Sequence, residues 1–188
     1  FTSNPKCSPC RATILTGRNS WQLKEAINHY SIFPNDFAVY PDVLAKAGYF
    51  TGHTGKGWGP GDFQSTGFKH NPAGPAFMKH RNKPPATGIS PVDYAANFNF
   101  FLEQKPKDQP FCFWFGLQEP HRAYELNSGV RLGKSLRDVV VPDYLPDLAA
   151  VRGDLADYAI EVEYGDMMVG RALAALEAEG LEIGRAHV

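Results

Sequence analysis

The residues best suited to chemistry begin near the start of the chain with Cys7, Pro9 and Arg11. Proline is tolerated in the first turn of a helix, where its missing N–H costs nothing, and Gly17 is a typical helix end. The spacing therefore predicts that Cys7 lies at or just before the N-terminus of a short helix. Unpaired N–H groups at such an end favour a bound anion and an ionised nucleophile. Arg11, about one turn further on, can fold back over the same point as a fork-shaped donor.

Two further groups of polar residues follow predicted strands. Lys56 lies in a glycine-rich loop after residues 49–53, which are β-prone. His121 and Arg122 follow an almost continuous apolar run at residues 111–117, which is typical of a buried strand. Ligands of open parallel sheets bind beyond the carboxyl ends of the strands, so we expect these groups to serve one site. A nucleophile with several fixed cations suits a tetrahedral anion.

Helices and strands alternate along the chain, which indicates an α/β fold. Helical spacing and capping residues predict further helices over residues 43–47, 93–105 and 148–180, and Gly165 could interrupt the last of them. Residues 62–91 are rich in glycine and proline and carry an excess of cationic residues over acidic ones. They are predicted to form a functional or mobile loop that would suit an anionic substrate.

Seven positions near the start of the chain are spaced as Cys-x-Pro-x-Arg followed by Leu-Thr-Gly-Arg: Cys7, Pro9, Arg11, Leu15, Thr16, Gly17 and Arg18. This pattern resembles the signature of the sulfatase family, although Cys10 stands where that family more often has serine. The resemblance implies an alkaline-phosphatase-like three-layer sandwich with a mostly parallel central sheet, here truncated at both ends. It also implies that a formylglycine-generating enzyme converts Cys7 to formylglycine, an aldehyde whose hydrate attacks sulfur.

The same resemblance implies hydrolysis of a sulfate ester or N-sulfate, on a sulfated carbohydrate or another small sulfate ester. Arg11 would orient the hydrate and shield its charge, while Lys56 and His121 would hold sulfate oxygens and stabilise the departing group. A calcium ion would polarise the sulfate. Of its ligands only Cys7, as formylglycine, is expected within this chain. We therefore expect the 188-residue chain alone to bind calcium poorly and to lack useful activity.

Two departures from the family pattern bear on the substrate. Trp58 stands where the family commonly has histidine, and it is interpreted either as a platform for a sugar ring or as ordinary packing. The order Glu119-Pro120-His121-Arg122 looks most like the heparan N-sulfatase branch, although Gln118 and Glu119 replace its histidine–aspartate pair. The resemblance implies that Arg122 contacts the sugar or N-sulfate, with Gln118 and Glu119 as neighbouring substrate-binding residues. A structural salt bridge of Arg122 with Glu119 or Glu125 is the alternative.

Other classes of function remain open. Cys7 and Cys10 also form a C-x-x-C pair, as in redox proteins or in half of a zinc site. A zinc site needs a second ligand pair, however, and Cys112 is the only other cysteine in the sequence. A phosphonate or phosphate monoester hydrolase of the same superfamily would use the same nucleophile. A non-catalytic binder of sulfated glycans would follow if Cys7 stayed unconverted.

Composition sets broad limits. The chain of 188 residues is long enough to bury a core as one domain, and its formal net charge of -1 gives no indication of a nucleic-acid partner. No apolar run approaches membrane-spanning length, and three cysteines leave the redox compartment open. Residues 182–188 look like the translation of a sequencing-adapter tail, so we expect residues 1–181 to be part of a single sulfatase catalytic domain. A periplasmic or secreted location is implied by the resemblance alone.

Overall fold

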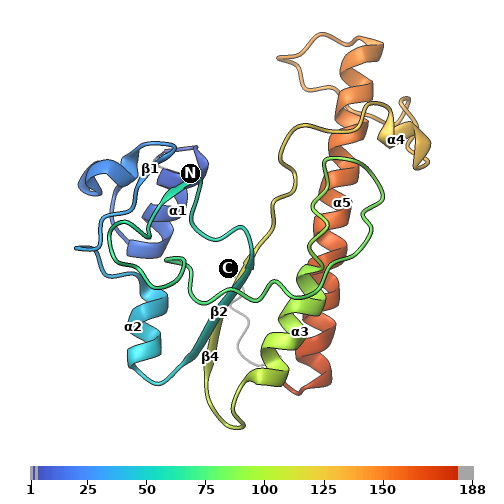
Figure 1. The fold of residues 1–188 in the computed structure, drawn as a ribbon. Helices are drawn as coiled ribbons and strands as arrows, with labels where there is room; N and C mark the ends of the chain where they lie inside the picture. The colour runs from blue at the N-terminus through green and yellow to red at the C-terminus, as the bar shows by residue number, and fades with distance from the viewer. Residues whose placement is uncertain (1, 3, 182–188) are drawn as a thin grey trace. The chain divides into compact units, whose positions relative to one another are not determined.

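The structure is a computed structural model that describes residues 2 and 4–181. The strands of this part of the chain are β1 (Ser31–Ile32), β2 (Phe50–Gly55), β3 (Gly61–Asp62) and β4 (Phe111–Gly116) (Figure 1). The helices are α1 (Cys7–Thr16), α2 (Tyr40–Lys46), α3 (Tyr94–Gln104), α4 (Ser128–Arg131) and α5 (Ala149–Ala178), with short 3-10 helices at Ser20–Gln22 and Lys24–Ile27. The predicted tail at residues 182–188 lies outside the described residues.

The strands pair in parallel, as an α/β fold requires. β2 runs beside β4 from Phe50 opposite Phe111 to Gly55 opposite Gly116, and β1 pairs in parallel with β3 (Figure 1). Parallel neighbours need a long crossover connection, and α3 lies in the connection from β2 to β4. The predicted α/β class with parallel strands is therefore confirmed, and β2 and β4 end together at their carboxyl ends.

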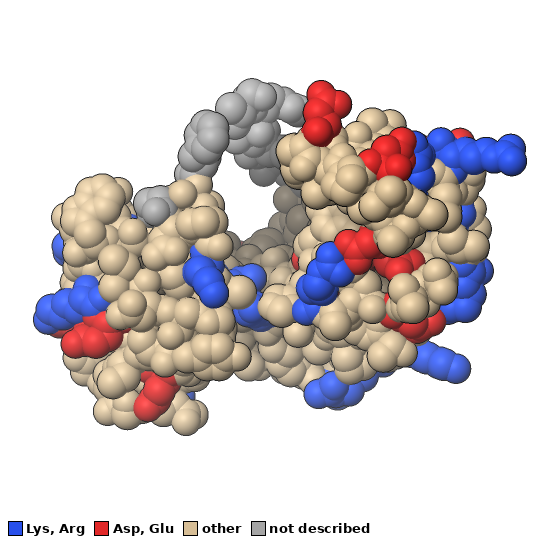
Figure 2. All heavy atoms as spheres, turned by 90° about the horizontal axis from the view of Figure 1, so that it is seen from above, with Lys and Arg blue, Asp and Glu red and all other residues tan. Residues whose placement is uncertain are grey.

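The chain divides into two compact units, each described here by itself. Unit 1 comprises residues 1–79 and 97–116, and unit 2 comprises residues 80–96 and 117–188. This division reflects how compactly each unit packs. It does not test the expectation of a single catalytic domain, which stays a prediction. Both signs of charge are interspersed on the face shown in Figure 2. Within residues 2 and 4–181, no helix is both long and apolar enough to cross a bilayer.

Unit 1 holds two apolar clusters that fix its strands and helices. Phe98 and Phe101 of α3 pack on Phe113 of β4, with ring centroids 5.0 and 4.5 Å away. A second cluster under α1 is fully closed to solvent at Leu15 and Phe33. Burial of such side chains contributes about 1.5–3 kcal/mol each, so these clusters hold α3 against β4 and anchor α1 in unit 1.

The start and end of α1 follow the expected rules. Lys6 is extended, with φ -126° and ψ 151°, and Cys7 is the first residue of the helix. The helix ends at Gly17, whose φ of 66° favours glycine and whose N–H donates to the carbonyl of Thr13. The prediction that Cys7 lies at a helix N-terminus is confirmed.

Unit 2 is organised around α5. This helix is continuous from Ala149 to Ala178, so the expected interruption at Gly165 is wrong. Gly165 instead allows close packing, because an added Cβ there would lie 3.3 Å from the Leu117 side chain. Asp157 of α5 accepts hydrogen bonds from the N–H groups of Asn127 and Gly129, and so caps the start of α4.

Candidate active site

The tip of α1 brings together a thiol and an ammonium group. Lys56, the first residue after β2, donates from Nζ to Sγ of Cys7 over 3.2 Å. Both side chains are half-buried. Because the N-terminal end of a helix carries a partial positive charge, an anion or an ionised group at residue 7 would meet positive charge from both directions.

Arg11 holds the loop that carries Lys56. Its Nη1 donates to the carbonyl oxygens of Lys56 at 2.6 Å and Gly57 at 3.1 Å, and its guanidinium lies 5.7 Å from the ring centroid of Trp114. Burial lowers the pKa of Arg11, and the nearby sulfurs of Cys7 and Cys10 oppose that shift. Arg11 therefore lies beside the thiols, as its spacing predicts, and also positions Lys56.

The carboxyl end of β4 supports the same loop. The N–H of Lys56 donates to the carbonyl of Gly116 over 2.6 Å, and the indole N–H of Trp114 donates to the carbonyl of Lys56 over 3.0 Å. A Cβ on Gly116 would lie 2.1 Å from the Lys56 carbonyl oxygen. Sequence reasoning missed Trp114 and Gly116. The signal that could have found them is the position of both near the end of the second parallel strand.

Trp58 is a packing residue in this structure. It is 3% exposed, its ring lies edge-on to Phe33 with centroids 5.0 Å apart, and its indole N–H donates to the carbonyl of Ser8. No open ring face is left for a sugar, so the platform interpretation is not supported and the packing alternative applies. Burial against Ser8 instead ties the glycine-rich loop to the first turn of α1.

Asn71 is a third residue that sequence reasoning missed. Its Oδ1 accepts from the N–H of Trp58 at 2.7 Å and of Ala73 at 3.0 Å, while its Nδ2 donates to the carbonyl of Trp58 at 2.9 Å. Asn71 thus binds both the N–H and the carbonyl of Trp58, and so fixes the backbone of the glycine-rich loop at that residue. Because its partner Trp58 lies thirteen positions back in the chain, no local pattern identifies this contact.

The other predicted site residues belong to unit 2. His121 is exposed, and its Nδ1 pairs with the carbonyl of Arg122. Arg122 forms a two-pronged ion pair with Asp154, both N–O distances being 2.5 Å. A salt bridge was the alternative for Arg122, but the predicted partners Glu119 and Glu125 are wrong, because α5 places Asp154 opposite the guanidinium. The structure thus groups Cys7, Arg11 and Lys56 in unit 1, and Gln118, Glu119, His121 and Arg122 in unit 2.

Glu119 is a supporting residue of the loop at residues 118–122. It is 9% exposed and accepts from the N–H of Ser90 and the hydroxyl of Tyr94, both at 2.8 Å. The same hydroxyl accepts from the N–H of Gln118, whose side chain is exposed. Burial, and secondly the charge of Glu119, raises the pKa of Glu161 on α5 to about 7. These contacts make Glu119 a support for residues 118–122, with its carboxylate already occupied.

The residues present do not form a calcium site. Calcium takes six to eight oxygen ligands, whereas the groups around Cys7 are a thiol, an ammonium and a guanidinium. Within residues 2 and 4–181, no cluster of three or more His, Cys, Asp and Glu side chains could hold a metal ion. The zinc alternative therefore finds no ligand set in this part of the chain, and no reaction step is assigned to calcium.

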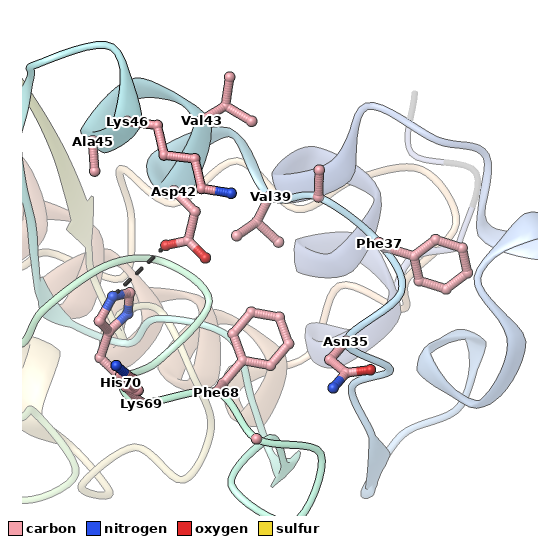
Figure 3. Close-up of a pocket in the computed structure, with 12 residues that line it drawn as sticks. Asn35, Phe37, Val39, Asp42, Val43, Ala45, Lys46, Phe68, Lys69 and His70 are labelled. Carbon is pink, nitrogen blue, oxygen red and sulfur yellow. Dashed lines mark ion pairs between the residues drawn. The ribbon is translucent and has the colours of Figure 1, made fainter.

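Unit 1 also contains a cavity of about 540 Å³ beside α2, which Figure 3 shows. Asp42 at the start of α2 and His70 form an ion pair across it at 3.7 Å, and Lys46 and Phe68 also line it. Cys7, Arg11 and Lys56 are not among its lining residues. The cavity is therefore separate from the tip of α1.

Parallel strands, the crossover through α3 and a cysteine held among fixed cations define an α/β protein with a candidate anion site at the tip of α1. The family model described as Sulfatase matches residues 1–183. The chain belongs to the sulfatase family.

Named relatives agree with this assignment. N-sulphoglucosamine sulphohydrolase of Homo sapiens is 27% identical over an alignment of 208 positions, which covers 96% of this chain and 40% of the human protein. The chain thus spans well under half the length of that relative. The human protein also bears out the likeness to the heparan N-sulfatase branch.

Solved structures share the fold. One, BT33494S-sulf, is linked to the metabolism of multiple glycosaminoglycans by Bacteroides thetaiotaomicron. It matches with a TM-score of 0.70 and 17% identity, over 96% of this chain and 47% of its own. Another, BT4656 in complex with its substrate D-glucosamine-2-N,6-O-disulfate, matches with a TM-score of 0.65 and 17% identity, over 97% of this chain and 55% of its own.

Proposed function

We propose that the protein is a sulfatase that hydrolyses a sulfate ester or an N-sulfate of a sulfated sugar, with residue 7 as the nucleophile after conversion to formylglycine. The observation that carries the proposal is the contact between Lys56 Nζ and Cys7 Sγ at the N-terminus of α1. A nucleophile next to a fixed cation is what attack on a sulfate monoester or sulfamate anion requires, since the cation also neutralises the charge of the sulfate oxygens.

When present, formylglycine supplies the hydrate oxygen that attacks sulfur. The residues of this chain bind and orient the reactants around it. The ammonium of Lys56 holds a sulfate oxygen within reach of residue 7, and the N-terminal N–H groups of α1 add positive potential at the same place. Arg11 keeps the Lys56 loop at this distance through two carbonyl hydrogen bonds. Preorganised donors of this kind cost little reorganisation during reaction.

Residues 118–122 belong to unit 2 and are proposed as substrate contacts on the likeness of Glu119-Pro120-His121-Arg122 to the heparan N-sulfatase branch. His121 is exposed and acts as a donor to the sulfate or to the departing group. Arg122 and Gln118 contact the sugar, and Glu119 positions the loop through Ser90 and Tyr94. The guanidinium of Arg122 is engaged by Asp154, so we assign Arg122 a sugar contact through its remaining N–H and its apolar stem.

An amino sugar is the proposed substrate. The human relative is named for N-sulphoglucosamine, and BT4656 is described with a glucosamine disulfate as its substrate. Calcium is implied by membership of the family, but its ligands are not assembled in residues 2 and 4–181. The proposal for this chain therefore concerns residue 7 and the cations around it.

Peptide mass spectrometry of the protein, produced with a formylglycine-generating enzyme, tests the nucleophile. The peptide with residue 7 should lose one sulfur and two hydrogens and gain one oxygen. Cys7→Ala is the control that cannot be converted. A thiol that stays intact would overturn the catalytic proposal and leave a non-catalytic binder of sulfated glycans.

A phosphonate or phosphate monoester hydrolase is the second candidate, because the same nucleophile and cations suit both tetrahedral anions. Parallel assays with a sulfate ester, a sulfamate and a phosphate ester of one sugar separate the two. For a full-length protein that contains this chain, we expect turnover of the sulfated substrates. Turnover of the phosphate ester alone would replace the sulfatase proposal.

A further inference from the structure

Cys7 and Cys10 lie one turn apart at the start of α1. Cys7 is the first residue of this ten-residue helix and Cys10 is the fourth. Both thiols are free and half-buried, as is that of Cys112. The proposed sulfatase mechanism uses Cys7 and gives no role to Cys10, which leaves the second thiol unexplained.

The first turn of α1 brings the thiols close to bonding geometry. Residues three apart on a helix have Cβ atoms about 5–6 Å apart, and a disulfide needs about 3.5–4.5 Å. Cys10 is held in place, because its N–H donates to the carbonyl of Lys6 over 3.0 Å and Pro9 before it is fully buried. Cys7 follows the extended Lys6 and has no intrahelical partner for its N–H. Cys7, the end residue of the helix, is therefore the member of the pair that would move to close the gap.

Two cationic side chains lie beside the pair, and a thiolate is the form of cysteine that attacks a disulfide. Lys56 Nζ donates to Sγ of Cys7. The guanidinium of Arg11 lies near enough to interact with both Cys7 and Cys10. Positive charge at a helix N-terminus is the common surrounding of reactive cysteines.

We propose that Cys7 and Cys10 form a dithiol that closes to an intramolecular disulfide by exchange with a low-molecular-weight disulfide such as oxidised glutathione. The Cys7 thiolate attacks one sulfur of oxidised glutathione and releases one glutathione thiolate. The Cys10 thiolate then attacks the Cys7 sulfur of the mixed disulfide and releases the second. The protein loses two electrons and two protons, and one glutathione disulfide becomes two glutathione thiols.

This pair has a consequence that rests on the proposed function. While the disulfide is closed, residue 7 has no thiol from which the aldehyde can form. Cys10 thus makes formylglycine formation depend on the redox state of the newly made chain, and it protects Cys7 from irreversible oxidation.

The test uses the reduced, unconverted protein incubated with oxidised glutathione, quenched with acid, alkylated and digested with trypsin. Cleavage after Lys6 and Arg11 yields one peptide, Cys7–Arg11, that carries both thiols. In the wild type this peptide should escape alkylation and be lighter by two hydrogens than the reduced peptide. In Cys10→Ser, a glutathione adduct on Cys7 should persist. Cys112→Ser is the matched control and should behave as the wild type.

Two results would overturn the dithiol. One is a wild-type peptide with both thiols still alkylated after the incubation. The other is a glutathione adduct that persists on the wild type as it does on Cys10→Ser. The thiol readout does not depend on the aldehyde, so it separates this proposal from the sulfatase proposal.

A second experiment links the two proposals. The oxidised and the re-reduced chains are each treated with a formylglycine-generating enzyme, and aldehyde is expected only in the re-reduced one. Aldehyde in both would overturn the regulatory consequence. Aldehyde in neither would count against the proposed nucleophile while the disulfide result stands.

Discussion

Arg11 combines two tasks in one side chain. Its charge lies beside the thiols of Cys7 and Cys10, and its guanidinium hydrogens satisfy the carbonyls of Lys56 and Gly57. Lysine could supply the charge but not the planar fork that reaches two acceptors. The fork geometry therefore matters to the position of Lys56 as much as the charge does.

We expect Arg11→Met to lower the free energy of unfolding by about 1–3 kcal/mol, because it leaves the Gly57 carbonyl without this donor and the Lys56 carbonyl with that of Trp114 alone. Arg18→Met is the matched control, since Arg18 is exposed and its guanidinium lies 5.4 Å from the centroid of the Phe37 ring. That control should cost about 0.5 kcal/mol or less. Urea unfolding measures both. Equal losses for the two variants would show that the carbonyl contacts of Arg11 carry no stability.

The raised pKa of Glu161 predicts that the stability of the protein depends on pH. Burial, with the charge of Glu119 as the second cause, raises its pKa from an ordinary 4.5 to about 7. Between pH 4.5 and 7 the unfolded chain loses this proton before the folded chain does, so the contribution of Glu161 to stability is complete below 4.5 and is lost as the pH rises through 7. Glu161→Gln should therefore stabilise the protein at pH 8 by about 1–2 kcal/mol relative to the wild type.

Urea unfolding at pH 4.5 and pH 8 measures this difference. Glu163→Gln removes one negative charge from an exposed position of the same helix and is not expected to stabilise the protein at the higher pH. A Glu161→Gln variant whose advantage is the same at both pH values would contradict the assignment.

For single residues, the sequence predicted their place in a helix or strand better than it predicted which residues surround them. The helix start at Cys7 follows from local rules on proline and glycine, and it is confirmed. The burial of Trp58 depends on Phe33 and Asn71, which are distant in the chain, so no local pattern could decide between packing and a sugar platform. The predicted ion-pair partners of Arg122 were wrong for the same reason, since its actual partner Asp154 is 32 positions away.

The contact of α4 with α5 depends on one glycine. A Cβ on Gly129 would lie 2.5 Å from the carbonyl carbon and 2.7 Å from the Cβ of Ala156. Because these are backbone and first side-chain atoms, they cannot rotate away. The N–H of Gly129 also donates to Asp157 over 2.8 Å, which fixes α4 at this distance.

Gly129→Ala should therefore cost about 1–3 kcal/mol, the usual penalty for overpacking. Gly153→Ala is a control on α5 itself, because its added Cβ would meet no atom within 4 Å. That change should stabilise the helix by about 0.5–1 kcal/mol. Thermal unfolding gives both values. A neutral Gly129→Ala would mean that α4 moves freely over α5.

Periodicity predicted the longer elements well, because they depend on patterns within one segment. The helix at residues 94–104, the strand at residues 111–116 and the helix at residues 149–178 lie within a few positions of the predictions. The predicted role of Gly165 was wrong. A glycine inside a helical pattern indicates a break, whereas here Gly165 makes room for Leu117. Strand register could not be predicted either, so Gly116 was missed.

For the molecule as a whole, alternation of helices and strands predicted the α/β class, and the cysteine signature predicted the family. The sequence could not show how closely Lys56 approaches residue 7, since that depends on Trp114, Gly116 and Arg11 acting on one loop. A motif thus identifies the chemistry, and tertiary contacts set its geometry.

The 188-residue chain alone should show no turnover of an aryl sulfate and no saturable calcium binding, even after conversion of residue 7. Two observations support this: residues 2 and 4–181 assemble no metal-ligand cluster, and the chain spans 40% of the length of the human relative. Lys56 and the tip of α1 should still bind sulfate weakly, since their contacts lie within unit 1. Calorimetry with calcium and with sulfate, next to an aryl sulfate assay, measures all three. Lys56→Met is the control for sulfate binding, and turnover by the 188-residue chain would show that its own residues suffice for the reaction.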